Sequence, residues 1–437
     1  MPREMKKSGV SWLDEIPVNW ETARLKGTFS FGKGLPITKD NLVEQGIPVI
    51  SYGQIHSKTN SGVRVQDDLI RYVDPAYIET NPESLVHIGD FIFADTSEDR
   101  EGCGNCVYVD KEMQLFAGYH TVVLKANDKI DSRFLAYQFK TDPWRTQIRA
   151  EVSGVKVFSI SRKILSNTTM LIAPDEEQKL IADFLDHKCA EIDRVMAATE
   201  KTIAEYKALK QSIITEAVTK GVRGKRPMKD SGIAWIGEIP KDWSVALLKY
   251  SIRWKSEKGA PDEEVLSLYR DYGVIPKDSR DDNHNVTSLD TSGYKVVDVG
   301  DFVINKMKAW QGSMAISDYR GIVSPAYHVC TITTPHINKK YFHYLMRNPL
   351  YIPEYLRLST GMRIGQWDLG FDDFKNLPFI LPSEEEQQEI VDFIEEKSEA
   401  IDQLIGNKQQ LLEELTTYKK SIIYEYVTGK KEVPACQ

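Results

Sequence analysis

The amino-acid sequence contains two copies of one internal repeat. Residues 8–20 read SGVSWLDEIPVNW, and residues 231–243 read SGIAWIGEIPKDW. Seven positions are identical at the same spacing, including both tryptophans and the Ile-Pro pair. An internal repeat constrains the fold more than any other feature, because each copy must build the same structural unit.

The two copies match at their ends and diverge in their middles. Ile88 to Phe91 corresponds to Val299 to Phe302, and Val218-Thr219 corresponds to Val427-Thr428. The offset between the copies falls from 223 to 209 along the chain, so the middle of the second copy is shorter. This pattern indicates one shared framework that carries two different variable regions.

The first part of each copy, roughly 10–172 and 233–380, is rich in short β-branched and aromatic runs separated by turn residues. Such runs predict strands, and the segments Arg133 to Phe139 and Lys339 to Met346 predict helices. We therefore expect a mixed, mainly β domain in each copy. The predicted boundaries are 1–172 and 223–380 for these domains, 173–222 and 381–430 for the helices that follow, and 431–437 for a tail.

The last part of each copy predicts one long helix. Pro174 and Pro382 precede acidic first turns, and no proline interrupts 175–220 or 383–430. About 45 residues at 1.5 Å each span about 65 Å, which favours a coiled coil over a helix lying on a globular core. The predicted seam consists of Leu185, Lys188, Ile192, Val195, Thr199, Thr202, Tyr206, Leu209 and Ile213, and of Ile394, Lys397, Ile401, Leu404, Lys408, Leu411, Leu415, Tyr418 and Ile422.

The short connection after the first helix favours pairing of the two helices. Residues 221–227 reach at most about 25 Å, so the second domain must begin near the end of the first helix. The second helix can then pack on the first only by running back along it. The predicted fold is α+β: two mixed, mainly β domains at opposite ends of a long antiparallel two-helix coiled coil, with an internal pseudo-two-fold axis.

Composition restricts the class of protein further. The 437 residues carry a net charge of −8, which is unusual for a nucleic-acid binder and requires a local basic face or charge supplied by partners. The sequence has neither an apolar run of about 20 residues nor a signal peptide, so we expect a cytoplasmic protein without a membrane partner. Cys103 and Cys106 lack a second ligand pair, so we expect no metal site.

Two similar domains held apart by a stiff spacer suit duplex DNA, which has its own two-fold symmetry. Because the two copies differ in their middles, the two half-sites should differ as well. The sequence therefore predicts an asymmetric target in two parts, separated by a spacer that is not read.

Several segments resemble the specificity subunits of Type I restriction–modification systems. They are the paired openers, LIAPDEEQKLIADFLD at 171–186, NKMKAWQGSMAISDYRGIVSPAY at 305–327, and GMRIGQWDLGFDDFKNLPFILPSEEEQ at 361–387. The resemblance covers nearly the whole chain in its characteristic order. The first copy departs from it at 94–106, where ADTSEDREGCGNC replaces the lysine-rich segment of the second copy.

The resemblance implies that both domains are target recognition domains and that the helices set their spacing. It also implies docking of two modification subunits, which bring S-adenosylmethionine and methylate adenine, and of restriction subunits that use ATP and Mg. The chain itself would bind no cofactor and hold no catalytic residue.

Candidate DNA contacts lie in polar loops of both copies. Lysine, arginine and glutamine suit phosphates and base edges, and aromatic side chains can stack on bases. The alternatives are a solvated hairpin in the first copy, and a basic surface loop or a salt bridge in the second. The candidates are Tyr52, Gln54, His56, Lys58, Asn60 and Lys156 in the first copy, and Lys306, Lys308, Trp310, Gln311, Arg363 and Gln366 in the second.

Two segments resemble enzyme motifs, but each lacks a residue that the motif requires. The segment Gly27 to Lys33 resembles a phosphate loop, but Gly34 stands where Ser or Thr must hold magnesium. Asn348 to Tyr351 resembles an adenine methyltransferase signature, but it lacks the second proline and is better explained as the end of a helix. Trp12, Trp20, Trp235 and Trp243 recur at fixed spacing, which predicts core packing. A scaffold that holds two protein partners apart remains an open alternative.

Overall fold

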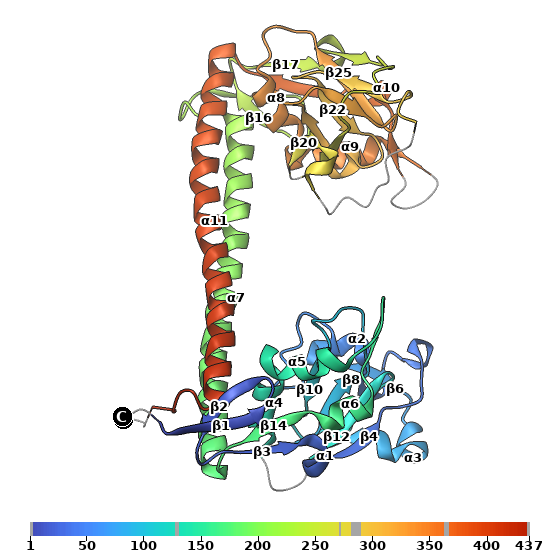
Figure 1. The fold of residues 1–437 in the computed structure, drawn as a ribbon. Helices are drawn as coiled ribbons and strands as arrows, with labels where there is room; N and C mark the ends of the chain where they lie inside the picture. The colour runs from blue at the N-terminus through green and yellow to red at the C-terminus, as the bar shows by residue number, and fades with distance from the viewer. Residues whose placement is uncertain (1–2, 127–130, 271, 281–289, 362–366, 435–437) are drawn as a thin grey trace. The chain divides into compact units, whose positions relative to one another are not determined.

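The computed structural model describes residues 3–126, 131–270, 272–280, 290–361 and 367–434. The chain forms two compact units (Figure 1). Unit 1 comprises Met1–Thr199 and Gln410–Gln437, and unit 2 comprises Glu200–Gln409. Each unit holds one globular domain together with a part of each long helix.

The globular domain of unit 1 is built on the antiparallel sheet β10-β8-β12-β4 and the mixed sheet β6-β5-β11-β7. The central strands β8 and β12 are almost wholly buried, which explains their continuous apolar sequences FIFA and TVVL. The elements are β1 Met5–Val10, β2 Leu13–Pro17, β3 Glu21–Arg24, α1 Leu25–Thr28, β4 Ser30–Lys33, β5 Ile47–Ile50, α2 Tyr52–Ile55, β6 Arg71–Val73, α3 Tyr77–Thr80, β7 Leu85–Val86, β8 Phe91–Ala94, β9 Thr96–Ser97, β10 Cys106–Tyr108, β11 Leu115–Ala117, β12 Thr121–Lys125, α4 Ser132–Phe139, α5 Asp142–Glu151, β13 Phe158–Ser159, α6 Arg162–Asn167 and β14 Thr169–Ile172.

The globular domain of unit 2 repeats the first sheet as β18-β25-β22-β23. Its elements are β15 Met228–Asp230, β16 Glu238–Pro240, β17 Ser244–Leu247, β18 Ile252–Lys255, β19 Leu266–Tyr269, β20 Gly273–Pro276, β21 Lys295–Val297, β22 Phe302–Asn305, β23 Met314–Ile316, β24 Gly321–Val323, β25 Tyr327–Ile332, α8 Lys339–Met346, α9 Ile352–Leu358, β26 Ser359–Thr360, β27 Asp368–Leu369, α10 Phe371–Phe374 and β28 Pro378–Leu381.

The two domains share their framework and differ elsewhere, as the repeat predicts. The hairpins β1-β2 and β15-β16 correspond, and so do the pairs β3-β14 and β17-β28. Both predicted short helices are present as α4 and α8. Where unit 1 has its mixed four-stranded sheet, the described part of unit 2 has the separate pairs β19-β20 and β21-β24. The prediction of two mixed, mainly β domains is therefore confirmed.

The two predicted long helices are α7, Asp175–Lys220, and α11, Glu384–Val427. Each begins with three acidic residues, which the positive end of the helix dipole favours. In unit 1 Phe184 stacks against Tyr426, while Lys419 forms an ion pair with Asp193 further along α7. As the position advances along α7, its partner moves back along α11, so the helices are antiparallel.

Unit 2 has the same antiparallel helix pairing between its own parts of α7 and α11. Lys210 of α7 pairs with Asp402 of α11 at 2.7 Å, and Arg223, just after the end of α7, pairs with Glu389 of α11 at 2.6 Å. The predicted antiparallel packing of the two helices therefore appears in both units.

The predicted seam is wrong at four of its positions. Val195, Leu209, Leu404 and Tyr418 are 44–56% exposed rather than buried. From Leu185 onward, successive seam positions are separated by four and then three residues, rather than by three and then four as predicted. In two places adjacent apolar pairs, 404–405 and 411–412, fit both spacings. The positions that face the other helix are Leu185, Cys189, Ile192, Met196, Thr199, Ile203, Tyr206 and Lys210, and Ile394, Ile401, Ile405, Lys408, Leu412, Leu415, Lys419 and Ile422.

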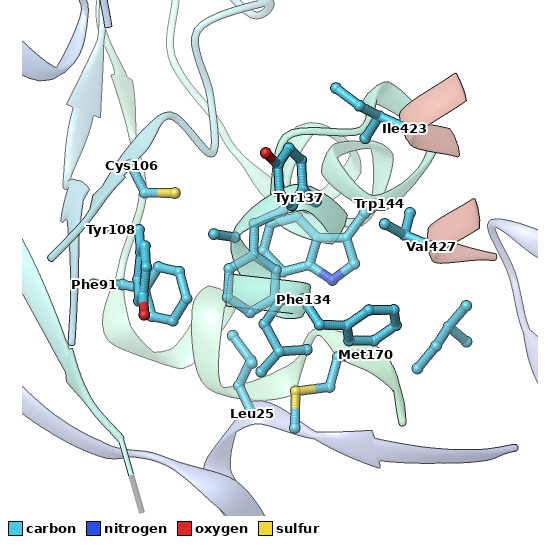
Figure 2. Close-up of a cluster of buried hydrophobic side chains, with 14 of the residues drawn as sticks. Leu25, Phe91, Cys106, Tyr108, Phe134, Tyr137, Trp144, Met170, Ile423 and Val427 are labelled. Atoms are coloured by element: carbon cyan, nitrogen blue, oxygen red, sulfur yellow. The ribbon is translucent and has the colours of Figure 1, made fainter. Parts of the chain in front are cut away.

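The end of α11 is part of the hydrophobic core of unit 1. Ile423 and Val427 pack at the edge of the cluster that contains Phe134 and Trp144 (Figure 2). Both side chains of α11 are at most 2% exposed. In unit 2 the end of α7 does the same, because Val218 is fully buried in that core. Each globular domain is therefore completed by the helix that the other copy of the sequence supplies.

Candidate nucleic-acid interface

The first predicted loop, residues 51–60, begins with the short helix α2. Ser51 caps this helix, and its backbone N–H donates a hydrogen bond to Oε1 of Gln54 at 3.1 Å. Ser and Gln at this spacing form a capping box, which fixes where the helix starts. Gln54 therefore contributes its side-chain oxygen to the loop's own structure.

Two further candidates in this loop are also engaged within the protein. Nε2 of His56 lies 2.8 Å from the carbonyl oxygen of Thr96, and Nδ1 lies 3.1 Å from the amide nitrogen of Asn105. Asn60 donates to the carbonyl oxygens of Ile55 and Cys106 at 2.7 and 3.0 Å. These contacts hold the loop against the loop 96–106.

Tyr52 and Lys58 remain at the surface of the same loop. Lys58 is exposed. Tyr52 is half-buried and makes edge contacts with Tyr119 and His120, whose ring centroids lie 5.7 and 5.4 Å away. The pair Tyr119-His120 was not among the predicted contacts, although its recurrence as Tyr327-His328 is a signal in the sequence.

Lys156 lies at the tip of a hairpin that carries exposed apolar side chains. The hairpin is closed by the bridge between Ser153 and Ser159. Gly154 is required there, because a Cβ atom would lie 2.1 Å from the carbonyl oxygen of Val157. Val155 is 96% exposed and Val157 is 54% exposed. Sequence reasoning missed these two valines, because an apolar residue next to a strand predicts burial.

The predicted loop of unit 2 follows strand β22. Lys308 is exposed, and Lys306 forms an ion pair with Asp368 at 2.7 Å. Trp310 is half-buried rather than part of the core, and its ring meets Trp367 edge-on at 5.1 Å. Gln311 ends the turn just before Gly312, which has a left-handed φ of 78°. The loop thus presents one cation and one indole edge.

Residues at the same place in the two sheets differ in charge. Asp95 follows β8 as Lys306 follows β22. The carbonyl oxygen of Asp95 accepts a hydrogen bond from the backbone N–H of Ile160, and that of Lys306 accepts one from the backbone N–H of Leu369. Asp95 lies 3.3 Å from Nδ1 of His120, whereas Lys306 pairs with Asp368. The shared backbone therefore carries opposite charges at this point.

The remaining predictions have mixed outcomes. Trp20 and Trp243 are fully buried, as predicted, and Trp12 and Trp235 pack partly buried against the same cores. Arg363 and Gln366 lie outside the described residues.

The motifs weighed as enzyme signatures have structural roles. Asn348 caps the turn Pro349–Tyr351, and its side chain accepts a hydrogen bond from the backbone N–H of Leu350 at 3.1 Å. Cys103 and Cys106 are both buried, and burial raises the pKa of the Cys106 thiol to about 12. Within the described ranges no cluster of three or more His, Cys, Asp or Glu side chains could hold a metal ion.

None of the helices in the described parts of the chain has both the length and the apolar character needed to cross a bilayer.

Comparisons with known proteins agree with the duplicated architecture. Two curated specificity subunits of type I restriction enzymes from Methanocaldococcus jannaschii, MjaX and MjaVIII, are each 26% identical to this chain. The alignments cover 54% and 56% of this chain and 53% and 51% of those proteins. The chain thus spans about half the length of these two relatives.

A solved structure shares the fold over almost the whole chain. It belongs to a study titled "Structural basis underlying complex assembly and conformational transition of the type I R-M system". The TM-score is 0.68 at 15% identity, over 95% of this chain and 99% of the other.

The sequence family described as the Type I restriction modification DNA specificity domain matches this chain twice, at residues 17–204 and 252–416. Each match covers most of one globular domain and part of the long helix that follows it. Because these matches cover more than half of the sequence, the chain belongs to the Type I restriction modification DNA specificity family.

Proposed function

We propose that this chain is the DNA specificity subunit of a Type I restriction–modification complex, in which each globular domain reads one half of an asymmetric, two-part duplex target. The observation that carries the proposal is the double match to the specificity family, once over each globular domain. The domain boundaries 1–172, 173–222, 223–380, 381–430 and 431–437 belong to the same proposal.

Two unlike half-sites follow from two unlike loops on one framework. Asp95 and Lys306 occupy equivalent places but carry opposite charges. Because Asp95 engages His120 and Lys306 engages Asp368, the same framework position supports two differently built loops. A shared framework with exchanged side chains therefore favours two readers of different sequences over a scaffold with two equal arms.

The predicted contacts divide by how freely their side chains can reach a ligand. We propose that the exposed or half-exposed ones touch DNA: Tyr52, Lys58, Lys156, Lys308, Trp310 and Gln311. Gln54, His56, Asn60 and Lys306 stay in the interface but act chiefly by holding these loops through the hydrogen bonds and the ion pair described above. Arg363 and Gln366 remain proposed contacts from sequence.

The catalytic chemistry is assigned to partners. Two modification subunits would dock on the helices and bring S-adenosylmethionine, and restriction subunits would bring ATP and Mg. In this assembly the chain supplies sequence recognition, and the helices set the number of unread base pairs. It contributes no catalytic residue and binds no cofactor.

The test is selection of bound duplexes by the complex reconstituted with its modification subunits. We expect a two-part motif with an unread spacer. Exchange of residues 233–380 for the corresponding segment of another family member should change one half of that motif only. Recovery of one continuous motif would contradict two readers, and assembly without any sequence preference would favour the scaffold.

A further inference from the structure

Each unit has an open cleft between its globular domain and a long helix. In unit 1 the cleft has a volume of about 620 Å³ and lies between the loops 55–62 and 101–106, the start of α5 and the last turns of α11. In unit 2 a cleft of about 390 Å³ lies between the end of α8, the turn at 311–312 and the last part of α7.

The two clefts occupy equivalent places in the repeat. Lys140 ends α4 and lines the first cleft, as Arg347 ends α8 and lines the second. On the helix side Ile423 lines the first cleft and Ile214 lines the second, at the offset of 209 that relates the two helices. A feature present in both divergent copies belongs to the framework that the copies share.

The first cleft has an excess of positive charge although the chain is acidic overall. Arg149 is neutralised, since it pairs with Asp142 at 3.0 Å and donates to the carbonyl oxygen of Glu101 at 2.7 Å. Arg145 donates to Oδ1 of Asn105 at 2.6 Å, which is an uncharged partner. The cationic residues of the lining are Lys140, Arg145, Arg149 and Lys420, against Glu101 and Asp142.

Two buried polar atoms in this lining have no hydrogen-bond partner among the described residues, namely Nε of Arg149 and Oγ of Ser61. A buried donor left unpaired costs about 1–3 kcal/mol, so such a group indicates a ligand that accepts hydrogen bonds.

The second cleft is also lined by cationic residues, Lys210, Arg270 and Arg347, and none of its described lining residues is acidic. Lys210 pairs with Asp402 at 2.7 Å, and Arg347 donates a hydrogen bond to the carbonyl oxygen of Arg270. Burial and the neighbouring Arg347 lower the pKa of His343 to about 3, so this imidazole adds no charge.

Each cleft adjoins residues that the proposed function places at DNA. Asn60 lines the first cleft and Gln311 lines the second. Phosphates flank every base that such a loop reads, and phosphate contacts fix the register of a reader on the duplex. The position of the clefts therefore favours the DNA backbone over an acidic segment of a protein partner.

We infer that the cleft of unit 1 binds a phosphate group of the target DNA backbone, an inference that rests on the proposed function. Lys140 with Lys420 would hold the phosphate. The shared framework then holds the duplex at this point, while the divergent loops read the bases.

The test is the salt dependence of duplex binding by the reconstituted complex carrying Lys140→Gln with Lys420→Gln. Each phosphate contact contributes about 0.9 to the slope of log affinity against log salt, so the slope should become shallower by about 0.9. The selected motif should stay unchanged. Lys26→Gln, an exposed lysine of α1 outside the cleft, is the matched control and should keep the parent slope.

A neutral methylphosphonate placed singly along the duplex identifies the phosphate. At one position it should weaken binding by the parent complex about tenfold, the equivalent of about 1.4 kcal/mol, and have no effect on the double variant. Equal losses of affinity in the parent and the variant at every position would overturn the inference. An unchanged salt slope together with weaker assembly with the modification subunits would also overturn it. Loss of the two-part motif in the parent itself would instead refute the proposed function.

Discussion

Trp20 donates its indole N–H to Oε2 of Glu177 at 2.9 Å and so joins the opener of the first copy to the first turn of α7. The other oxygen of this carboxylate pairs with Arg3 at 2.6 Å, and the Arg3 guanidinium lies 5.3 Å from the centre of the Trp20 ring. Gly429, which follows α11, packs on the same indole, since a Cβ there would lie 3.2 Å from Cζ2 of Trp20. One tryptophan thus joins the ends of both helices to its domain.

Unit 2 repeats this arrangement with different burial. Trp243 donates to Oε2 of Glu386 at 3.0 Å, and Arg226 pairs with the same carboxylate. Gly221, which follows α7, packs on Trp243 in the same way. Glu386 is 1% exposed at its side chain, whereas Glu177 is 23% exposed. The recurring tryptophan and Glu-Glu-Gln motifs are therefore partners, although they are far apart in sequence.

Glu386→Ala should destabilise unit 2 by about 3 kcal/mol, because it removes the acceptor of the buried Trp243 indole N–H and leaves the Arg226 cation with only Asp242, at 3.6 Å, as a partner. Hydrogen exchange followed by mass spectrometry should show faster exchange in peptides of β15, β16 and the start of α11. The matched control is Glu385→Ala, an exposed neighbour that should change stability by no more than about 0.5 kcal/mol. Equal effects of both variants would show that the buried carboxylate is not what joins helix to domain.

The corrected seam makes a second prediction. Ile405→Ala should cost about 2–5 kcal/mol, because this side chain is 8% exposed and faces α7. Leu404→Ala should cost at most about 1 kcal/mol, because Leu404 is 44% exposed. Urea unfolding followed by circular dichroism at the helix band measures both. A larger loss for Leu404→Ala would restore the seam predicted from sequence.

The framework could be predicted from sequence because its signals are local and occur twice. The start of each long helix, the short helices α4 and α8 and the buried Trp20 and Trp243 all follow from recurring motifs. The seam spacing could not be predicted, because adjacent apolar residues satisfy two spacings that differ by only one position. Only packing against the other helix decides between them.

The basic clefts could not be predicted, because their residues come from separate elements. Lys140 caps the end of α4, Arg145 lies on α5 and Lys420 lies on α11, and only the fold brings them to one lining. One signal was present: Lys140 and Arg347 align as cations at the ends of both predicted short helices. Hairpin tips such as Val155 stay unpredictable for a different reason, since exposure of an apolar side chain has no local signature.

Binding should weaken with rising pH through one lysine. Burial, together with the neighbouring Lys419, lowers the pKa of Lys140 to about 8, and Arg145, Asp193 and Cys189 are the other charged or titratable groups that influence it. A phosphate favours the protonated ammonium, so affinity is full below this pKa and falls as the pH rises through it. We expect a several-fold loss between about pH 7.5 and 9 in duplex titrations.

Lys140→Arg is the control for this pH effect, because a guanidinium stays charged throughout the range. The variant should bind with a flat profile. If it loses affinity over the same interval as the parent, another group is responsible and the assignment to Lys140 fails.

The hairpin tip of unit 1 should act on one half-site only. Lys156→Ala removes an exposed cation, so we expect weaker binding and a salt slope that is shallower by about 0.9.

Val155→Ser changes a side chain that is 96% exposed, so stability should stay within about 0.5 kcal/mol of the parent. An apolar tip can contact a thymine methyl group or wedge between base steps, so the serine variant should relax the motif where the tip contacts it. Binding titrations at several salt concentrations measure the slope, and sequencing of duplexes selected by each variant measures the change of motif. Lys308→Ala, which removes an exposed cation from the loop after β22 in unit 2, should alter only the other half of the motif. Relaxation of both halves by either variant would show that the two domains do not read separately.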